Sequence, residues 1–389
     1  MNVPKLRFKE FDGEWEYHQF SEIVNRVSKS SNSNILPKVE FEDIVAGEGR
    51  LKKNVANKFD DRKGTLFQPN NILYGKLRPY LKNWLFPKFQ GVALGDFWVF
   101  EAVNIAPAFL YALIQSENYQ RVANDTAGTK MPRSDWKKVS TTKFAIPMNI
   151  KEQEKIGVFF EILDKKIQLQ QQKIDLLQEQ KKGFLQKMFP KAGEKQPQVR
   201  FAGFTDDWEQ RKFGEIITER REKTKIENED TLLSSAIDGM YLNSELFSHF
   251  RGKSNIGYLK IRKNDMILSA QNLHLGNCNI NQRFEHGIIS PAYKVYSLVN
   301  VDAAFMHAWI KKDSTKQFFE NATTEGASVC RKNIEWGTLY SQKIYIPIYS
   351  EQQKIGELFN VLDRRIQLQQ QKLELLQKQK KGFMQKMFI

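Results

Sequence analysis

The chain has 389 residues, a formal net charge of +15, 41% hydrophobic residues and 12% aromatic residues. These values exclude general disorder, because the chain holds enough apolar side chains for two or three packed domains. Two cysteines exclude a disulfide framework or a four-cysteine zinc site, and no apolar run reaches the ~18 residues of a membrane span. Without an apolar signal region at its start, the chain is expected to be reduced and cytoplasmic, with a polyanionic partner, most simply nucleic acid.

The first predicted element is a globular domain over residues 1–150. Within it, the basic segment YGKLRPYLK at 74–82 follows an apolar run and predicts a strand that enters a turn, and a second basic segment, GTKMPR, lies at 128–133. Arginine and lysine suit phosphates and guanine edges, whereas a solvated loop or a structural ion pair is the alternative for each residue. The candidate DNA-binding residues here are Tyr74, Lys76, Arg78, Tyr80, Lys82, Thr129, Lys130 and Arg133.

A long helix is predicted over residues 151–190, because apolar residues recur there at alternating spacings of four and three. A glutamine and a lysine, Gln170 and Lys181, interrupt this seam. Asn149 followed by Glu152 predicts a capping box at its start, and Pro190 ends the helix. The seam positions used below are Ile156, Phe160, Leu163, Ile167, Gln170, Ile174 and Leu177.

A polar linker at 191–198 leads into a second globular domain over residues 199–348. Scattered residues repeat the first domain; for example, Asn71-Ile72-Leu73 is answered by Met266-Ile267-Leu268. Amide side chains take the place of the basic ones after this strand, and they suit adenine edges. The candidate DNA-binding residues of this domain are Ser269, Gln271, Asn272, His274, Arg331 and Lys332.

A second long helix over 349–389 repeats the first one. Residues 155–190 and 354–389 are identical at 25 of 36 positions, with an offset of 199 residues. Ser350 followed by Gln353 predicts the capping box here. The seam positions are Ile355, Phe359, Leu362, Ile366, Gln369, Leu373 and Leu376.

The two helices are expected to pair with each other, because each would otherwise leave its seam in water. An antiparallel pair places one domain at each end and gives the chain a pseudo-two-fold axis. Gln170 and Gln369 then fix the register near that axis, unless both point to the solvated rim. Thirty-six helical residues span ~54 Å, against ~34 Å for one turn of B-DNA, so the pair is long enough to act as a ruler on one duplex.

A second apolar line runs beside each seam and recurs every seven residues. A two-helix pair does not need it, so these residues either pack on the domains of the chain or dock helices of a partner. They are Ile162, Leu169, Leu176, Val361, Leu368 and Leu375.

Motifs for catalysis are missing from the sequence. It contains no Walker phosphate loop, no G-x-G-x-x-G fingerprint and no Pro-Pro pair of the kind found in amino-methyltransferase motifs. The five histidines show no metal-ligand spacing. The sequence therefore favours a binding protein over a stand-alone nuclease or methyltransferase, and it predicts no metal site.

With its tandem halves, the YGKLRPYL run, the IP…EQ.KIG helix entry and the Q-L-Q-Q-Q-K…KKGF.QKMF helices, the chain resembles the specificity subunit of type I restriction–modification enzymes. The resemblance implies an α+β protein with two target recognition domains, separated by two helical spacers that pair as an antiparallel coiled coil. Each domain would read one half of an asymmetric, bipartite site in double-stranded DNA, and the helices would set the gap. The implied partners are two modification subunits, which hold S-adenosylmethionine, and two restriction subunits, which use ATP and Mg; the chain itself would bind no cofactor and would not be an enzyme.

Two other functions stay open at this stage. The specificity subunit of a type IIB enzyme shares the same organisation, and a structural coiled-coil scaffold would need no DNA. The bases that are read do not follow from the sequence, because they depend on loop geometry and DNA shape.

Overall fold

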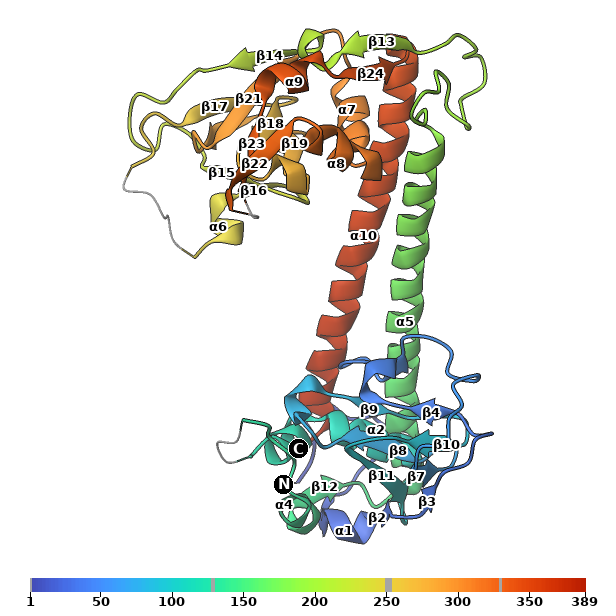
Figure 1. The fold of residues 1–389 in the computed structure, drawn as a ribbon. Helices are drawn as coiled ribbons and strands as arrows, with labels where there is room; N and C mark the ends of the chain where they lie inside the picture. The colour runs from blue at the N-terminus through green and yellow to red at the C-terminus, as the bar shows by residue number, and fades with distance from the viewer. Residues whose placement is uncertain (1, 127–129, 249–253, 329–330) are drawn as a thin grey trace. The chain divides into compact units, whose positions relative to one another are not determined.

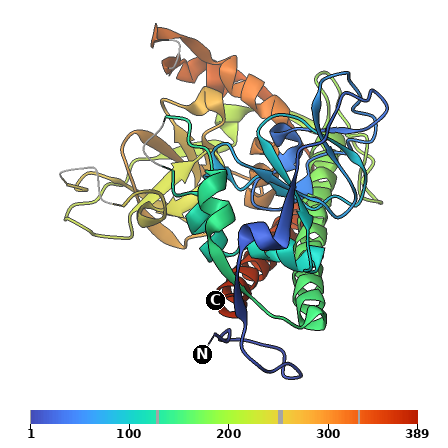
Figure 2. The ribbon, with the colours of Figure 1, turned by 90° about the horizontal axis from the view of Figure 1, so that it is seen from below.

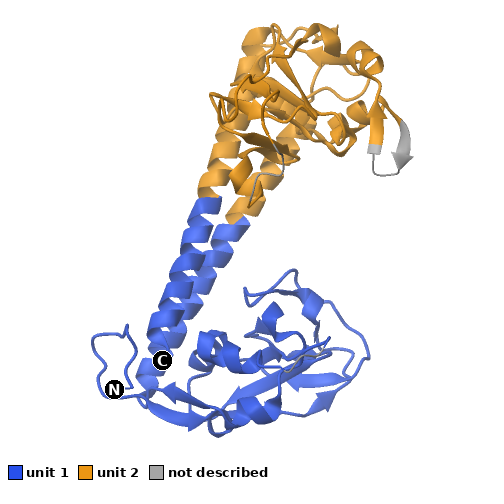
Figure 3. Ribbon diagram, turned by 90° about the vertical axis from the view of Figure 1, so that its left-hand side faces the viewer, with its two compact units in different colours: residues 1–172, 370–389 blue, residues 173–369 orange. Residues whose placement is uncertain are grey.

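The computed structural model describes residues 2–126, 130–248, 254–328 and 331–389, with side chains from 325 to 331 left out (Figure 1). The expected α+β architecture is confirmed. The chain forms two compact units, of residues 1–172 with 370–389 (unit 1) and residues 173–369 (unit 2), shown in Figure 3. Each unit thus holds a globular domain and parts of both long helices.

The domain of unit 1 is built on two four-stranded sheets, in the orders β2-β11-β8-β9 and β3-β7-β10-β4, and on the antiparallel pair β1-β12. Its helices are α1 (Phe20–Ile23), α2 (Pro107–Gln115), α3 (Glu117–Ala123) and α4 (Trp136–Thr141), with the short turns η1 (Phe41–Asp43) and η2 (Pro79–Leu81). Its strands are β1 (Glu16–Gln19), β2 (Val24–Val27), β3 (Ser30–Ser31), β4 (Lys38–Val39), β5 (Ile44–Val45), β6 (Arg50–Leu51), β7 (Gly64–Phe67), β8 (Ile72–Gly75), β9 (Trp84–Leu85), β10 (Gly91–Ala93), β11 (Phe97–Ala102) and β12 (Lys143–Ile146).

The domain of unit 2 repeats this plan. Its four-stranded sheet β14-β21-β18-β19 corresponds to β2-β11-β8-β9, and its pair β13-β24 corresponds to β1-β12. Its helices are α6 (Asn243–Leu246), α7 (Ala303–Ile310), α8 (Asp313–Glu320) and α9 (Trp336–Ser341), with η3 (Phe213–Glu215) and η4 (Leu273–Leu275). Its strands are β13 (Glu209–Lys212), β14 (Ile217–Arg220), β15 (Leu233–Ala236), β16 (Gly239–Leu242), β17 (Leu259–Arg262), β18 (Met266–Ser269), β19 (Cys278–Ile280), β20 (His286–Ile289), β21 (Tyr293–Leu298), β22 (Thr323–Ser328), β23 (Arg331–Ile334) and β24 (Lys343–Ile346).

The two long helices are α5 (Ile150–Lys187) and α10 (Tyr349–Met387). In unit 1 they run antiparallel, because Phe159 of α5 contacts Phe383 of α10 while Asp164, further along α5, pairs with Lys380, earlier in α10. In unit 2 the pairing of Lys181 with Asp363 belongs to the same arrangement. Antiparallel pairing explains why the compact units cut across the helices, since the end of one helix lies beside the start of the other.

The predicted seam is buried through most of its length. Ten of its positions are buried, and Leu177, Gln369, Leu373 and Leu376 are half-buried. The buried ones are Ile156, Phe160, Leu163, Ile167, Gln170, Ile174, Ile355, Phe359, Leu362 and Ile366. The ends of the seam pack into the domain cores rather than only against the other helix, because Ile156, Phe160 and Leu163 belong to the core of unit 1.

Each core is closed by a phenylalanine from just beyond the end of the incoming helix. In unit 1 the ring of Phe388 lies 5.6 Å from Phe109, 5.9 Å from Phe160 and 6.4 Å from Trp15. In unit 2 Phe189 takes the same place and contacts Phe305, Phe359 and Trp208 at 5.5, 6.1 and 6.0 Å. Aromatic clusters of this kind bury a large apolar area, so each domain is fixed to the helix that arrives from the other half.

The start of α5 corrects one expectation. Asn149 caps the helix, because its Oδ1 accepts a hydrogen bond from Lys151 N at 3.0 Å. Glu152 does not complete a capping box; it is buried and accepts two hydrogen bonds at 2.7 Å from the guanidinium of Arg7. An unpaired buried carboxylate costs more free energy than an incomplete helix cap, so Glu152 pairs with Arg7.

The capping box predicted at Ser350 and Gln353 is wrong. Helix α10 already begins at Tyr349, and the residue equivalent to Glu152 is Glu351, which is buried and bonded to Arg200 at 2.7 and 2.8 Å. The internal repeat of the helices therefore extends to this buried ion pair. The sequence pattern predicts the cap too late in the chain, because Ser350 and Gln353 have the spacing and residue types of a capping box although both lie inside the helix.

Both ends of the chain lie in unit 1, close together (Figures 1 and 2). Leu6 N donates to Lys386 O at 2.9 Å, and in unit 2 Val199 N donates to Lys187 O at the same distance. The end of α10 and the start of the chain in unit 1 are therefore hydrogen-bonded in the same way as the end of α5 and the segment that follows the linker in unit 2. Within the described ranges, no helix combines the length and the apolar character that crossing a membrane requires.

Candidate nucleic-acid interface

The first candidate segment forms a tight, strained loop between β8 and β9. Arg78 and Lys82 flank the turn η2 with φ of 49° and 56°, in the left-handed region that side chains other than glycine rarely occupy. The turn is closed by hydrogen bonds from Leu81 N to Arg78 O and from Lys82 N to Pro79 O, both 2.9 Å. Strain of this kind, ~1–3 kcal/mol per residue, persists where the surrounding structure fixes the backbone. Here it leaves Arg78, Tyr80 and Lys82 exposed.

The second candidate segment lies directly against this loop. Arg78 N donates to Pro132 O at 2.7 Å, and Ser134 N donates to Lys76 O at 2.8 Å. Lys76 and Arg133 also share one carboxylate, Asp96, at 3.6 and 3.0 Å. The structure therefore joins two segments that lie far apart in the sequence into one surface, which we call the unit 1 loop surface (residues 76–82 and 130–133).

The charges of the unit 1 loop surface are only partly neutralised. Among the residues that the structure describes, no carboxylate lies within ion-pair distance of Arg78, Lys82 or Lys130, which are all exposed. Unpaired cations can bind phosphates without first breaking an internal ion pair. Thr129, the remaining candidate of this segment, lies outside the described residues.

Tyr74 has to be removed from the candidate set. Its side chain is buried in β8, where it stacks on Trp98 and meets Tyr119 edge to face, and burial raises the pKa of its hydroxyl to about 12. The ring belongs to the core because β8 is an interior strand with both faces covered, so that all four of its residues are buried.

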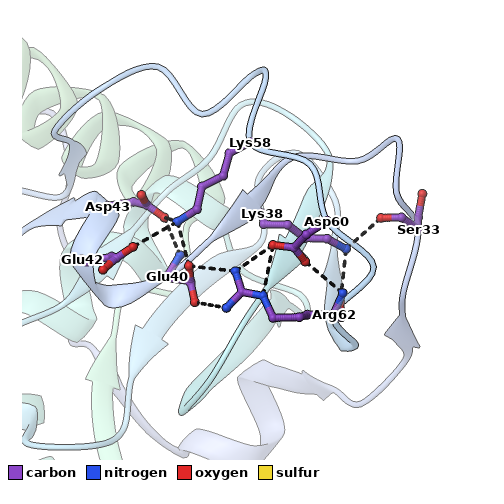
Figure 4. A network of polar contacts seen from close by, with 8 residues as sticks. All are labelled: Ser33, Lys38, Glu40, Glu42, Asp43, Lys58, Asp60 and Arg62. Carbon is purple, nitrogen blue, oxygen red and sulfur yellow. Dashed lines mark hydrogen bonds and ion pairs between the residues drawn. The ribbon is translucent and has the colours of Figure 1, made fainter.

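Another basic cluster in this domain is structural. Lys58 contacts Glu40 at 2.8 Å and Asp43 at 2.7 Å, and Arg62 donates to Glu40 at 2.6 Å (Figure 4). Burial opposes the charge of Lys58, but the carboxylates of Asp43 and Glu40 outweigh it and raise the pKa of the amine. Lys38 is fully buried and donates to Ser33 O at 2.8 Å. These cations fasten one loop to another and are paired with carboxylates or carbonyls rather than left for phosphates.

In unit 2 the equivalent loop follows β18 and contains η4. Gln271 and Asn272 are exposed, and His274 is half-buried. Ser269 is buried, and its Oγ accepts from Asn272 N at 3.2 Å, so it supports the loop rather than facing outward. The amide side chains are therefore the groups that this loop offers to a ligand.

The second segment of unit 2 pairs with Glu320, the last residue of α8, and α8 packs against η4 of the loop. Lys332 contacts Glu320 at 2.6 Å, and it is the main cause of the lowered pKa of that carboxyl, with His274 adding a smaller effect. Residues 271–276 and 332 are called the unit 2 loop surface below. Arg331 lies in β23, opposite Ser328, and its side chain is among those not described. Asp96 and Glu320, the carboxylates that pair with these candidate cations, carry no motif, so the sequence does not predict them.

The loops that follow β8 and β18 have equivalent positions in the two units. Gly75 N donates to Asn83 O at 2.7 Å, and Ser269 N donates to Asn277 O at 3.1 Å, so Gly75 is equivalent to Ser269. The sequence-based match of Asn71-Ile72-Leu73 with Met266-Ile267-Leu268 is therefore one residue out of register: strand pairing sets Ile72 opposite Phe100 and Met266 opposite Tyr296. In the corrected register Arg78 and Asn272 occupy the same position.

The second apolar line on the long helices is exposed. Ile162, Leu169, Leu176, Val361, Leu368 and Leu375 are each between 43% and 65% exposed. Of the two alternatives, packing on the domains of the chain itself is thereby excluded for these six residues. Each unit carries three of them, at positions related by the internal repeat of the helices.

In the part of the chain that the structure describes, no three His, Cys, Asp or Glu side chains gather where they could hold a metal ion. Among the described residues, Cys278 is a buried free cysteine, and burial raises the pKa of its thiol to about 12. A thiol of this kind stays protonated and unreactive.

Two α/β domains that repeat one plan, each fixed to paired long helices and each with its own polar loop surface, define a tandem recognition protein. The model of the type I restriction modification DNA specificity domain matches residues 13–179 and again residues 205–378. The chain belongs to this family and carries its domain twice, so DNA sequence recognition is its class of function.

Solved structures show the same fold over the whole chain. A type I restriction-modification system S subunit from M. genitalium is 13% identical, with a TM-score of 0.61, and the match covers 100% of this chain and 99% of that one. A chain from a structural study of complex assembly and conformational transition of the type I R-M system is 14% identical, with a TM-score of 0.53 and coverage of 95% and 96%.

Proposed function

We propose that this chain selects the DNA sequence for a type I restriction–modification complex, and that each unit reads one half of an asymmetric, bipartite site. The observation that carries this is the pair of loop surfaces at equivalent positions with different residues. Arg78 and Asn272 share one structural position, and arginine suits guanine whereas asparagine suits adenine. One scaffold that presents two chemistries is what recognition of two unlike half-sites requires.

The chain is proposed to recognise rather than to catalyse. Its loop surfaces offer cations, amides and an aromatic ring, which are the groups that bind phosphates and base edges. S-adenosylmethionine, ATP and Mg would be held by partner subunits. Two modification subunits and two restriction subunits complete the proposed complex.

The exposed apolar line supports two copies of the modification subunit. Unit 1 carries Ile162, Leu169 and Leu375, and unit 2 carries their repeats Val361, Leu368 and Leu176. Because an internal repeat presents the same docking surface twice, it recruits two identical partners. Leu169→Ser, with Leu368 intact, should lower the stoichiometry from two modification subunits to one in a mass measurement of the complex. Gln172→Ser, an exposed neighbour on α5, is the matched control and should leave two.

Selection from a pool of random duplexes tests the proposed function. The chain with its modification subunit should enrich two short, unlike motifs at a fixed spacing. Arg78→Ala should relax one base of one motif and leave the other motif unchanged, because each loop surface serves one half-site. Enrichment of a palindrome, or of no motif, would contradict the proposal.

A further inference from the structure

Both units display a leucine at the tip of the candidate loop. Leu81 is 41% exposed and Leu275 is 48% exposed, and each is the last residue of its short turn, η2 or η4. The alignment of Gly75 with Ser269 makes them equivalent, although the flanking loop sequences differ at almost every position. In unit 1 Tyr80, 56% exposed, stands beside Leu81.

The backbone holds each leucine outward. The first residue of the turn, Pro79 or Leu273, is buried and anchors it to the domain. The residue after each leucine is left-handed, Lys82 with φ of 56° and Gly276 with φ of 88°. Hydrogen bonds from Lys82 N to Pro79 O and from Gly276 N to Leu273 O, 2.9 and 2.8 Å, close the turn. An apolar side chain fixed in this way loses little entropy when it enters a ligand.

The surroundings of the tips are cationic. Arg78, Lys82 and Lys130 lie on the unit 1 loop surface with their charges exposed. In unit 2 the aliphatic carbons of Lys316 lie beside Gly276, so its amine is close to the turn. A leucine beside exposed cations, several in unit 1 and Lys316 in unit 2, is complementary to a polyanion with an apolar interior, and duplex DNA is the polyanion that stacks apolar bases between charged backbones.

We propose that Leu81 and Leu275 act as wedges that insert between neighbouring base pairs, one in each half-site. This inference rests on the proposed function and extends it to how the sequence is read. A wedge unstacks one base step and kinks the duplex, so steps that unstack easily are preferred even where no side chain contacts a base edge. Part of the specificity at each half-site is then recognition of DNA deformability.

The test uses the full chain with its modification subunit and the bipartite duplex recovered by selection. 2-Aminopurine, whose fluorescence rises when it is unstacked, is placed in turn at each adenine of both half-sites. The wild-type chain should raise the fluorescence at one step in each half-site. Leu81→Ala should abolish the rise in one half-site only and weaken binding about tenfold, and Leu275→Ala should do the same in the other half-site. Leu246→Ala, an exposed leucine of α6, is the matched control and should change neither signal.

The outcomes distinguish failure of the leucine wedge from failure of the proposed DNA recognition. If the wild-type chain binds a fixed-gap site with no fluorescence change at any position, the wedge is overturned while recognition stands. If Leu81→Ala keeps the fluorescence change but releases the modification subunit, the leucine contacts protein and the wedge is again overturned. If no bipartite site is recovered at all, the proposed function itself fails.

Discussion

The Nζ atom of Lys380 lies 2.5 Å from Oδ1 of Asp164, which joins the C-terminal part of α10 to the N-terminal half of α5 in unit 1. Lys181 and Asp363 repeat this pair in unit 2, also at 2.5 Å. The lysines are the residues that interrupt the apolar seam in the sequence. They interrupt it because each meets a carboxylate of the opposite helix, and in unit 1 the lysine also donates to Gln115 of α2 at 2.8 Å.

Replacing Lys380 by methionine should lower the free energy of unfolding by about 1–3 kcal/mol, because a mostly buried carboxylate loses its partner. Burial already raises the pKa of Asp164, and Lys380 opposes that rise. Without the lysine, the unfolded state releases the Asp164 proton at a lower pH than the folded state does. The difference in the free energy of unfolding between the wild-type chain and the variant should therefore grow as the pH rises above about 4.

Denaturant unfolding from pH 4 to pH 7 measures this effect. Lys378→Met, which removes an exposed lysine from the same helix, is the matched control and should cost much less. If both variants lose the same free energy of unfolding, or if the loss for Lys380→Met shrinks with rising pH, Lys380 does not stabilise the charge of Asp164.

The helices could be predicted in detail because their apolar seam is periodic and occurs in both copies of the repeat. The contacts that attach the helices to the domains could not be predicted. Glu152 fits a capping box by residue type, yet it is buried against Arg7, and only tertiary contacts distinguish the two roles. Likewise Gln153, which bonds Ala106 N at 2.8 Å and Pro147 O at 2.7 Å, and its repeat Gln352 look like ordinary helix-surface residues in the sequence.

The sequence predicts two separate segments in each domain, and in unit 1 the structure joins them. That contact could not be predicted, because it depends on backbone hydrogen bonds and on Asp96, a single carboxylate without a motif. The register of the two loops was one residue out, since the strands before them share only apolar character. Tyr74 lies in the core because both faces of β8 are buried, and the sequence alone does not show where the buried strand ends and the exposed loop begins.

The glycine of each KIG motif is a second point of contact between helix and domain. A Cβ on Gly157 would lie 2.6 Å from Ala108 Cβ, and one on Gly356 would lie 2.7 Å from Ala304 Cβ. Gly157→Ala should therefore destabilise the chain by about 1–3 kcal/mol, because the backbone of α2 cannot give way easily. Thermal unfolding of purified variants checks this.

A matched control exists on the same helix. A Cβ on Gly183 would meet nothing within 4 Å, so Gly183→Ala should stabilise the helix by about 0.5–1 kcal/mol. Equal effects of the two substitutions would mean that helix propensity, and not the close approach, governs position 157.

His307 makes unit 2 sensitive to acid. Burial, with a smaller contribution from Lys311, lowers the pKa of His307 from 6.5 to about 4, while Asp363 raises it and Lys181 lowers it. Between those two pH values the unfolded state binds a proton that the folded state excludes. The free energy of unfolding should therefore fall as the pH drops from 6.5 to 4, by up to about 3 kcal/mol.

The equivalent residue in unit 1 is Tyr111, whose pKa is raised well above 10 by burial, so it does not titrate in this range. His307→Gln removes the titrating ring, so its unfolding free energy should depend less steeply on pH between 6.5 and 4 than that of the wild-type chain. Paired denaturant titrations at pH 7 and pH 4.5 measure the difference. Parallel pH curves would show that His307 is protonated in the folded chain.

The ruler role of the helices is tested by removing seven residues from both. The two lysine–aspartate pairs are equally far apart along each helix, from Asp164 to Lys181 on α5 and from Asp363 to Lys380 on α10. Deleting 170–176 together with 369–375 shortens both separations equally, so both ion pairs can persist. The deletions also remove Leu176 and Leu375 of the apolar line, so a mass measurement must first show that the variant still holds two modification subunits. Seven helical residues are two turns and ~10 Å, which corresponds to about three base pairs.

The selected gap should therefore shorten by about three base pairs in the double deletion, with both motifs unchanged. Deleting only 170–176 makes the separations unequal, so that variant should lose one ion pair and bind the bipartite site at least tenfold more weakly. Selection from random duplexes reads out the gap, and a binding titration reads out the affinity. An unchanged gap in the double deletion would mean that the partner subunits, and not these helices, set the distance between the half-sites.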